Sequence, residues 1–141
     1  MNTRRIFCAL LAGLLLWPNL RGLAQDKNAE AAQRTDEVWL GLVDSGKYAE
    51  SYREAAATFQ AAVSEEKWVG ALETVRAPLG KLMTRTLKSA KYAKTLPGAP
   101  DGEYEVLIFE TSFEHKDAAV ETVTASLEKD GMWRVAGYYI K

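Results

Sequence analysis

Apolar residues recur at three- and four-residue spacing through much of the first half of the chain and at alternate positions through the second half. The first spacing places apolar side chains on one face of a helix, and the second places them on one face of a strand. The pattern therefore predicts helices followed by strands. Helices that cover one face of an antiparallel sheet define the α+β class, so we expect an α+β fold with a four-stranded antiparallel sheet.

Three helices are expected. The first spans residues 28–44, and its inward positions are Ala31, Ala32, Thr35, Val38, Trp39, Leu42 and Val43. The glycine of Ser45-Gly46 ends it. The second spans residues 48–63, with inward positions Tyr48, Tyr52, Ala55, Ala56, Phe59, Ala62 and Val63 and a capping-box spacing of Ser51 and Glu54. The third begins at the N-cap Ser64, is stopped by Pro78, and has the inward positions Trp68, Val69, Leu72 and Val75.

Four strands are expected at residues 81–95, 103–113, 120–127 and 132–140, with turns at residues 96–102 and 129–131. Strand 103–113 carries apolar residues on both faces, which predicts a central strand whose two faces are both covered. We expect the outer face of the sheet to be covered by a second copy of the chain. The basic residues of the first strand are interpreted as protection of a sheet edge against aggregation: Lys81, Arg85, Lys88, Lys91 and Lys94.

The N-terminus has the pattern of a secretory signal peptide. Arg4 and Arg5 precede an apolar run over residues 6–17, and Gly22 and Ala24 supply small residues before a cut at Gln25. The run is shorter than the roughly 18 residues that cross a bilayer, although an uncleaved anchor is the alternative if the run extends through Pro18. We therefore expect a signal peptide at residues 1–24, a single domain at 25–141, and export to the periplasm or the medium, with no membrane span after cleavage.

Composition and charge exclude several classes of function. The chain has 18 basic and 19 acidic residues, and residues 1–24 contain three arginines and no acidic residue, so the mature chain is mildly acidic. A nucleic-acid surface is not expected on such a protein. The one cysteine, Cys8, lies in the signal segment, so the mature chain has no thiol for a disulfide, a zinc site or nucleophilic catalysis.

No motif predicts a cofactor, a metal site or a catalytic residue. The only histidine, His115, lies in a polar turn without the partners that a metal or a catalytic role requires. The glycines do not form a phosphate-binding loop or a nucleophile elbow.

Aromatic residues are the strongest candidates for a binding site. Large aromatics can line a pocket for a small apolar ligand, and an arginine, Arg76 or Arg134, can meet an acidic group at its mouth. The same side chains are what a small core without disulfides needs, so core packing is the competing interpretation. The candidate pocket residues are Trp39, Tyr52, Trp68, Arg76, Tyr104 and Trp133.

Four segments carry a resemblance to a family: Trp68-Val69-Gly70-Ala71-Leu72, Val75-Arg76-Ala77-Pro78-Leu79-Gly80, residues 96–104 and residues 130–138. Together they resemble the uncharacterised bacterial domain-of-unknown-function family 4019, over about residues 31–141. This resemblance implies a small exported bacterial protein. The order of helices and strands is also similar to that of the nuclear-transport-factor-2-like superfamily, which implies a curved sheet that wraps a helix and leaves a conical pocket.

Three functions are compatible with these features. The first is a non-enzymatic module of the cell envelope that binds a small ligand or an envelope protein. The second is a pocket enzyme of the isomerase or dehydratase type, using a strand carboxylate (Glu105, Glu110 or Glu121) and a tyrosine (Tyr92, Tyr104, Tyr138 or Tyr139). The third is a purely structural envelope component.

Overall fold

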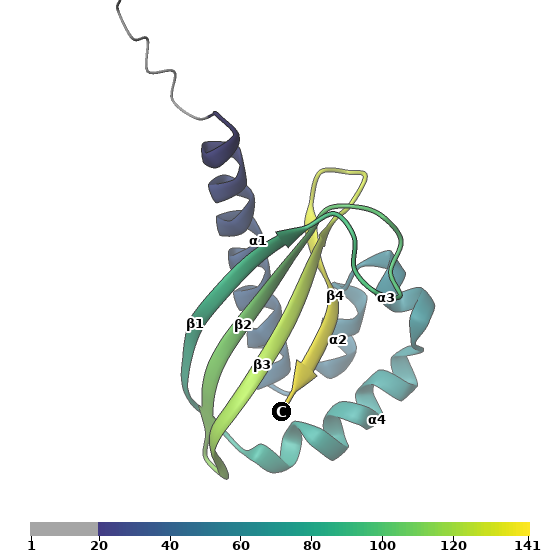
Figure 1. Cartoon of the computed structure of the whole chain (residues 1–141). Coiled ribbons are helices and arrows are strands. Elements are labelled where there is room, and N and C mark those ends of the chain that lie inside the picture. Colours follow the sequence, from purple (N-terminus) through teal and green to yellow (C-terminus); the bar gives the residue numbers. More distant parts are fainter. Residues whose placement is uncertain (1–19) are drawn as a thin grey trace, which may run out of the picture.

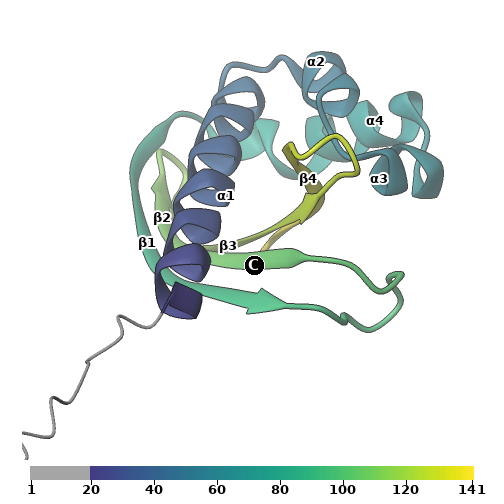
Figure 2. The ribbon, with the colours of Figure 1, turned by 90° about the horizontal axis from the view of Figure 1, so that it is seen from above.

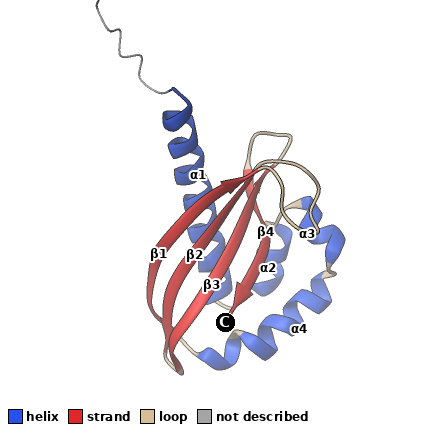
Figure 3. Cartoon of the chain, in the orientation of Figure 1, coloured by secondary structure: helices blue, strands red, loops and turns tan. Residues whose placement is uncertain are grey.

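The computed structural model describes residues 20–141 and has helices followed by an antiparallel sheet (Figures 1 and 3). The elements are α1 (Leu20–Asp44), α2 (Tyr48–Arg53), α3 (Ala57–Ala62), α4 (Glu65–Val75), a 3-10 turn η1 (Ala77–Leu79), β1 (Leu82–Ala93), β2 (Tyr104–Phe113), β3 (Lys116–Leu127) and β4 (Trp133–Ile140). The expected α+β class is confirmed. The predicted signal peptide lies almost wholly outside the described residues. None of the helices in residues 20–141 is long and apolar enough to cross a bilayer.

The sheet has the strand order β1-β2-β3-β4, and each strand is antiparallel to its neighbours. It curves around α1, which lies along its concave face, while α2, α3 and α4 are grouped beside β4 (Figures 1 and 2). β2 is therefore a central strand, as its apolar residues on both faces predict. Its concave face carries Leu107, Phe109 and Phe113, which are buried, and its convex face carries the half-buried Val106 and Ile108.

The core fills the space between α1 and the concave face of the sheet. Trp39, Leu40 and Val43 of α1 are almost completely buried. They belong to one cluster with Leu107 and Phe109 of β2, together with Val123 of β3 and Val135 of β4. The core cluster therefore joins residues that are distant in the sequence, as a helix packed on a sheet requires.

The ends of two helices follow the expected chemistry. The Ser64 hydroxyl accepts a hydrogen bond from the backbone N–H of Lys67 at 3.3 Å, which caps α4. At the end of α1, Gly46 has φ 74°, and the N–H of Lys47 donates to the Leu42 carbonyl at 2.9 Å. Only glycine adopts this backbone region readily, and the reversed turn satisfies a terminal carbonyl of the helix.

The prediction of one helix over residues 48–63 is wrong. The chain forms two short helices, α2 and α3, because Ala56 is extended at φ −61°, ψ 150°. Its N–H donates to the Val135 carbonyl of β4 at 2.8 Å, so a long-range bond replaces a helical one. Ser51 is no capping residue either: it is buried in α2, and its hydroxyl donates to the Tyr48 carbonyl at 2.7 Å.

Two predicted inward faces are also partly wrong. Val38 is 72% exposed and Val75 is 51% exposed, whereas Asp36 and Arg76 are buried. The face of α1 that meets the sheet passes through Ala32, Asp36, Leu40 and Val43. The polar Asp36 therefore occupies a core position of α1, and the apolar Val38 lies on the exposed side of the helix.

Candidate functional site

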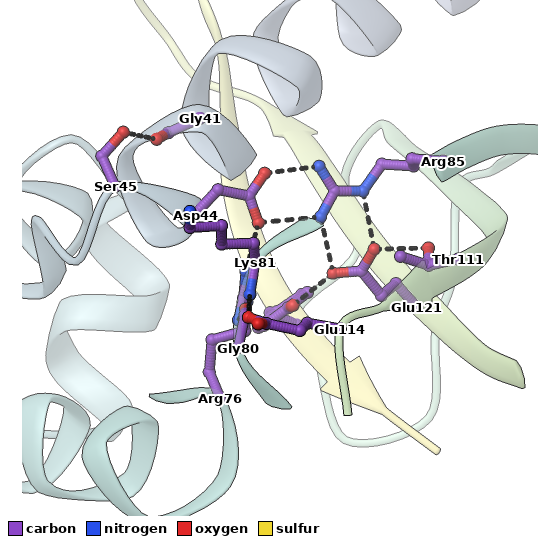
Figure 4. Close-up of polar contacts among 11 residues, drawn as sticks. Gly41, Asp44, Ser45, Arg76, Gly80, Lys81, Arg85, Thr111, Glu114 and Glu121 are labelled. Atoms are coloured by element: carbon purple, nitrogen blue, oxygen red, sulfur yellow. Dashed lines mark hydrogen bonds and ion pairs between the residues drawn. The ribbon is translucent and has the colours of Figure 1, made fainter. Parts of the chain in front are cut away.

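Buried charged side chains join α1, α4 and the sheet in one network (Figure 4). Its centre is Arg85 of β1, whose side chain is 11% exposed. Arg85 donates from Nη1 and Nη2 to the two carboxylate oxygens of Asp44, at 2.7 and 3.1 Å. It also donates from Nε and Nη2 to the two oxygens of Glu121, at 2.6 and 3.0 Å. One guanidinium thus holds the C-terminus of α1 to β3 by two fork-shaped ion pairs.

Glu121 of β3 is completely buried, and its two oxygens accept four hydrogen bonds. Besides Arg85, the Thr111 hydroxyl donates to Oε2 at 2.6 Å and the Tyr138 phenol donates to Oε1 at 2.5 Å. Burial, followed by the charge of Glu121, raises the pKa of Tyr138 above its ordinary value. The phenol therefore stays protonated and remains a donor, and the hydrogen bonds of the carboxylate are satisfied within the protein.

Arg76 extends the network toward α4. It donates from Nη2 to Asp44 at 3.0 Å and from Nη1 to the Gly80 carbonyl at 2.7 Å. Its guanidinium carbon also lies 4.4 Å from the centre of the Phe113 ring. Two arginines thus face two carboxylates, so the cluster is neutral. A neutral set joined by many hydrogen bonds is the arrangement in which charges are tolerated inside a protein, and in this set only the buried Nε of Arg76 has no hydrogen-bond partner among residues 20–141.

The proton on Arg85 is held firmly. Burial lowers the pKa of this guanidinium, but the hydrogen bonds and charges of Asp44 and Glu121 outweigh burial and raise the pKa above its ordinary value. Arg85 is thus a permanent cation, and Glu121 has a permanent counter-ion. Neither residue lines the surface grooves described below, so a substrate there does not reach them. The network orders the fold, and its geometry offers no free acid or base.

A groove of about 500 Å³ lies between α1, the α2 segment and the start of β4. Its apolar lining comes from Trp39, Leu42 and Trp133 together with two exposed side chains, Val38 at 72% and Met132 at 58%. Its charged lining residues are Arg34, Glu50, Glu54 and Arg134. An apolar surface bordered by a few charged groups is the usual composition of a ligand site. We call this the Trp39–Trp133 groove.

Arg134 is fixed in the groove by its neighbour in the β3–β4 turn. Its Nη1 and Nη2 donate to the two carboxylate oxygens of Asp130 at 3.0 and 2.8 Å. These hydrogen bonds raise the pKa of Arg134 and hold the pKa of Asp130 below its ordinary value. The side chain is one third exposed, so the cation remains accessible to an acidic group.

The six candidate pocket residues do not converge on one site. Trp39 and Trp133 line the Trp39–Trp133 groove, as does Arg134. Trp68 lines a separate cleft between α4 and β4, and Tyr104 lines a groove near residues 100–103 and 126–130. The other two candidates make hydrogen bonds within the fold: Tyr52 to the carbonyls of Gln60 and Val63, and Arg76 to Asp44.

A family model described as "Protein of unknown function (DUF4019)" matches residues 35–138. The chain belongs to this family. A comparison with curated proteins finds no match. The match includes every residue of the buried network and all but one residue, Arg34, of the Trp39–Trp133 groove. Both the buried network and the groove of this DUF4019 protein thus lie in the part of the chain that the family model matches.

The strand carboxylates of the enzyme alternative have different environments. Glu105 and Glu121 are buried, whereas the side chain of Glu110 is 62% exposed and pairs with Lys88 at 3.2 Å. Burial raises the pKa of Glu105 above its ordinary value. Its Oε1 has no hydrogen-bond partner among the described residues. Of these three carboxylates, only Glu121 forms a hydrogen bond with one of the predicted tyrosines, Tyr138, and this bond lies on the concave face of the sheet. The guanidinium of Arg85 already neutralises the charge of Glu121.

A third buried acid, Asp36 of α1, was missed by the sequence pattern. It is completely buried, and neither carboxylate oxygen has a hydrogen-bond partner in the described chain. Burial, and then the charges of Glu37 and Glu105, raise the pKa of Asp36 to about 8. Its position four residues after Ala32 and four before Leu40 was the available signal, because those residues share its helix face.

The interpretation of Arg85 as protection of the sheet edge is also wrong, because only 11% of its side chain is exposed. Lys81, Lys88, Lys91 and Lys94 are exposed, but Arg85 points to the concave face of the sheet. The signal was the residue type. Arginine forms fork-shaped pairs with carboxylates inside proteins, whereas lysine suits a solvated edge.

Proposed function

We propose that this DUF4019 protein is a non-enzymatic binding module of the cell envelope. In this proposal the Trp39–Trp133 groove takes up a small apolar ligand, or an apolar segment of an envelope protein. The observation that carries it is the pair of exposed side chains, Val38 and Met132, beside two tryptophans in a groove of about 500 Å³. Exposed apolar residues that gather in a concave site, bordered by charge, are typical of recognition.

The geometry supports binding over the isomerase-like alternative. That alternative needs a strand carboxylate with a free oxygen and a tyrosine facing a substrate. Glu121 and Tyr138 are hydrogen-bonded to each other, and both oxygens of Glu121 are occupied by donors of the protein itself. Glu105 has a free oxygen, but it is buried, it lines none of the grooves described above, and no tyrosine among residues 20–141 forms a hydrogen bond with it. The groove, in contrast, contains the partly exposed guanidinium of Arg134, which can bind an acidic group of a ligand.

The test is a fluorescence titration with 1-anilinonaphthalene-8-sulfonate, an apolar anion that matches the apolar lining and the arginines. Val38→Asp places a charge on the groove wall and should weaken binding about tenfold or more, because apolar area is lost and a like charge is added. Met83→Asp is the matched control: Met83 is also exposed, at 63%, but it lies in β1 and does not line the Trp39–Trp133 groove. Equal binding by wild type and Val38→Asp would contradict the proposal.

Export is the second part of the proposal. It is supported by the charged start, the apolar run at residues 6–17 and the small residues before Gln25. Among the side chains described, burial in the core of α1 begins at Ala32, which lies after the predicted cleavage point before Gln25. Cell fractionation followed by N-terminal sequencing should find the protein outside the cytoplasm with Gln25 first. A cytoplasmic protein that retains residues 1–24 would contradict export.

A homodimer through the convex face of the sheet remains part of the proposal. Val106 and Ile108 are half-buried there, and Val120 is 38% exposed. A second copy would remove these apolar side chains from water. Sedimentation at micromolar concentration should show a dimer that Val120→Asp dissociates. A monomer at every concentration would contradict this part and would leave the groove proposal standing.

A further inference from the structure

The free edge of β4 is covered along only part of its length. β4 pairs with β3 on one side, and no strand lies on its other side. Near the start of β4, the N–H of Ala56 donates to the Val135 carbonyl across this free edge. Beyond Val135 no backbone hydrogen bond to the free edge is found within the described residues. The second half of β4 therefore presents an open edge.

The register shows which backbone groups point outward. Lys141 and Val120 exchange both backbone hydrogen bonds, at 2.9 and 3.1 Å. In an antiparallel pair such bonded positions alternate, so Tyr139 also bonds to β3. The N–H and C=O groups of Tyr138 and Ile140 consequently point away from β3. Unpaired strand groups of this kind form a template for another strand.

A cleft of about 220 Å³ lies beside this edge, between β4 and α4. Its walls are apolar: Trp68, Ala71, Leu72 and Val75 of α4, and Tyr138, Tyr139 and Ile140 of β4. Val75 is 51% exposed, and the Trp68 and Tyr138 rings lie 6.3 Å apart. The open edge thus combines backbone hydrogen-bonding groups with an apolar cleft on the concave side.

The two edges of the sheet differ in charge. The β1 edge carries exposed lysines at positions 88 and 91, which discourage pairing with another strand. Residues 135–140 of β4, Val-Ala-Gly-Tyr-Tyr-Ile, contain no charged residue. The β4 edge lacks these charges, as is expected of a sheet edge that pairs with an extended segment of another protein.

We propose that an extended segment of a partner protein adds to β4 as a fifth strand. Two of its residues, separated by one, exchange backbone hydrogen bonds with Tyr138 and Ile140. Residues opposite each other in a sheet share a face, so the side chains of these two residues enter the α4–β4 cleft. The partner segment therefore has apolar side chains at alternate positions. This site is distinct from the Trp39–Trp133 groove, so either proposal can fail alone.

A second copy of the chain fits this edge less well. Its β4 would bring its own α4 to the same place, and both helices would need the space beside the paired strands. A single extended segment needs only the edge and the cleft. We therefore assign the edge to a partner strand.

The test uses a blocked heptapeptide, acetyl-Ser-Thr-Leu-Thr-Leu-Thr-Ser-amide, with the full chain. Nuclear magnetic resonance measures the hydrogen exchange of single amides. At about 1 mM peptide, exchange at Tyr138 and Ile140 should slow about tenfold, while Tyr139, already bonded to β3, changes little. The same peptide with N-methyl groups on both leucines cannot donate to the edge, and it should give no protection.

Ala71→Trp fills the cleft and should abolish protection by the peptide, whereas Ala61→Trp, at an exposed position of α3, should leave it unchanged. Unchanged exchange at Tyr138 and Ile140 with the unmodified peptide overturns the proposal. Equal protection by the N-methylated peptide also overturns the proposal, because the peptide would then bind through its apolar side chains alone and not through backbone hydrogen bonds to β4. Protection that rises with protein concentration alone, with a dimer in sedimentation, assigns the edge to a second copy instead.

Discussion

Arg85 and Glu121 form a fork-shaped ion pair on the concave face, reaching from β1 to β3 across the intervening strand β2. The Glu121 side chain is completely buried, and that of Arg85 is 11% exposed. Because Arg85 also binds Asp44, the pair ties the end of α1 to the sheet. Removing one member leaves buried charges without a partner, which is costly in a low-dielectric interior.

Arg85→Met should therefore lower the free energy of unfolding by about 3–5 kcal/mol, since Asp44 and Glu121 lose their shared cation. Urea unfolding measures the change. Arg53→Met is the matched control, because Arg53 makes the same fork-shaped contact with Glu65 on the surface, where solvent screens it. Similar losses in both variants would show that the buried network contributes no more than a surface pair.

Ser51 accepts hydrogen bonds from two of the core tryptophans, Trp39 and Trp68. Its backbone carbonyl accepts from Trp39 Nε1 at 2.7 Å, and its hydroxyl accepts from Trp68 Nε1 at 3.0 Å. Ser51→Ala leaves the Trp68 indole without a partner and should destabilise the fold by about 1–3 kcal/mol, measured by urea unfolding. Ser45→Ala, where the exposed hydroxyl donates to the Gly41 carbonyl, should have little effect. A stable Ser51→Ala protein would mean that the indole finds another acceptor.

Asp36 should make stability depend on pH. Burial raises its pKa to about 8, so the folded protein binds a proton that the unfolded chain has released above its ordinary pKa of 3.8. The contribution of the Asp36 carboxyl to the free energy of unfolding is complete below pH 4. It is lost as the pH rises toward 8, by up to about 1.4 kcal/mol per pH unit. Glu105, whose pKa is also raised by burial, acts in the same direction.

Asp36→Asn removes this ionisation and should raise the melting temperature at pH 8 more than at pH 4. Calorimetry at both values measures the difference. Glu73→Gln, at an exposed position of α4, is the control and should not change the shape of the pH profile much, because Glu73 does not contribute to the raised pKa of Asp36. A parallel profile for wild type and Asp36→Asn would show that Asp36 finds a partner for its charge.

Gly80 connects η1 to β1 with φ 75°, and its carbonyl binds Arg76. A Cβ there would lie 2.7 Å from Glu114 Oε2 and 2.9 Å from His115 Cδ2. Gly80→Ala should therefore cost about 1–3 kcal/mol, through the backbone conformation and the close contacts. Gly70→Ala, inside α4 with no atom within 4 Å of the new Cβ, should instead stabilise by about 1 kcal/mol. Thermal unfolding compares the two, and a neutral Gly80→Ala would show that the loop adjusts.

The features predicted well from the sequence depend on local chemistry. The Ser64 cap, the end of α1 at Gly46 and the two apolar faces of β2 follow from neighbouring residues alone. The break at Ala56 does not, because it depends on a bond to Val135, nearly eighty positions away in the chain. The sequence points to three of the ten residues that line the Trp39–Trp133 groove, Trp39, Trp133 and Arg134, as candidates for a binding site. Val38 was assigned to the core, because periodicity cannot tell which edge of an apolar stripe meets the sheet.

By itself the sequence determined the family, the order of helices and strands and the alternation of faces within β2 and β3, because residue period and turn chemistry act over a few positions. Only the tertiary structure decided which charges are buried and what they bind. Asp44, Arg85 and Glu121 are in contact because the sheet curves around α1. In the sequence, Arg85 is more than thirty residues away from each of the two carboxylates that it binds. Tertiary structure likewise decided that β4 keeps an open edge, since strand order is set by long-range pairing and not by local pattern.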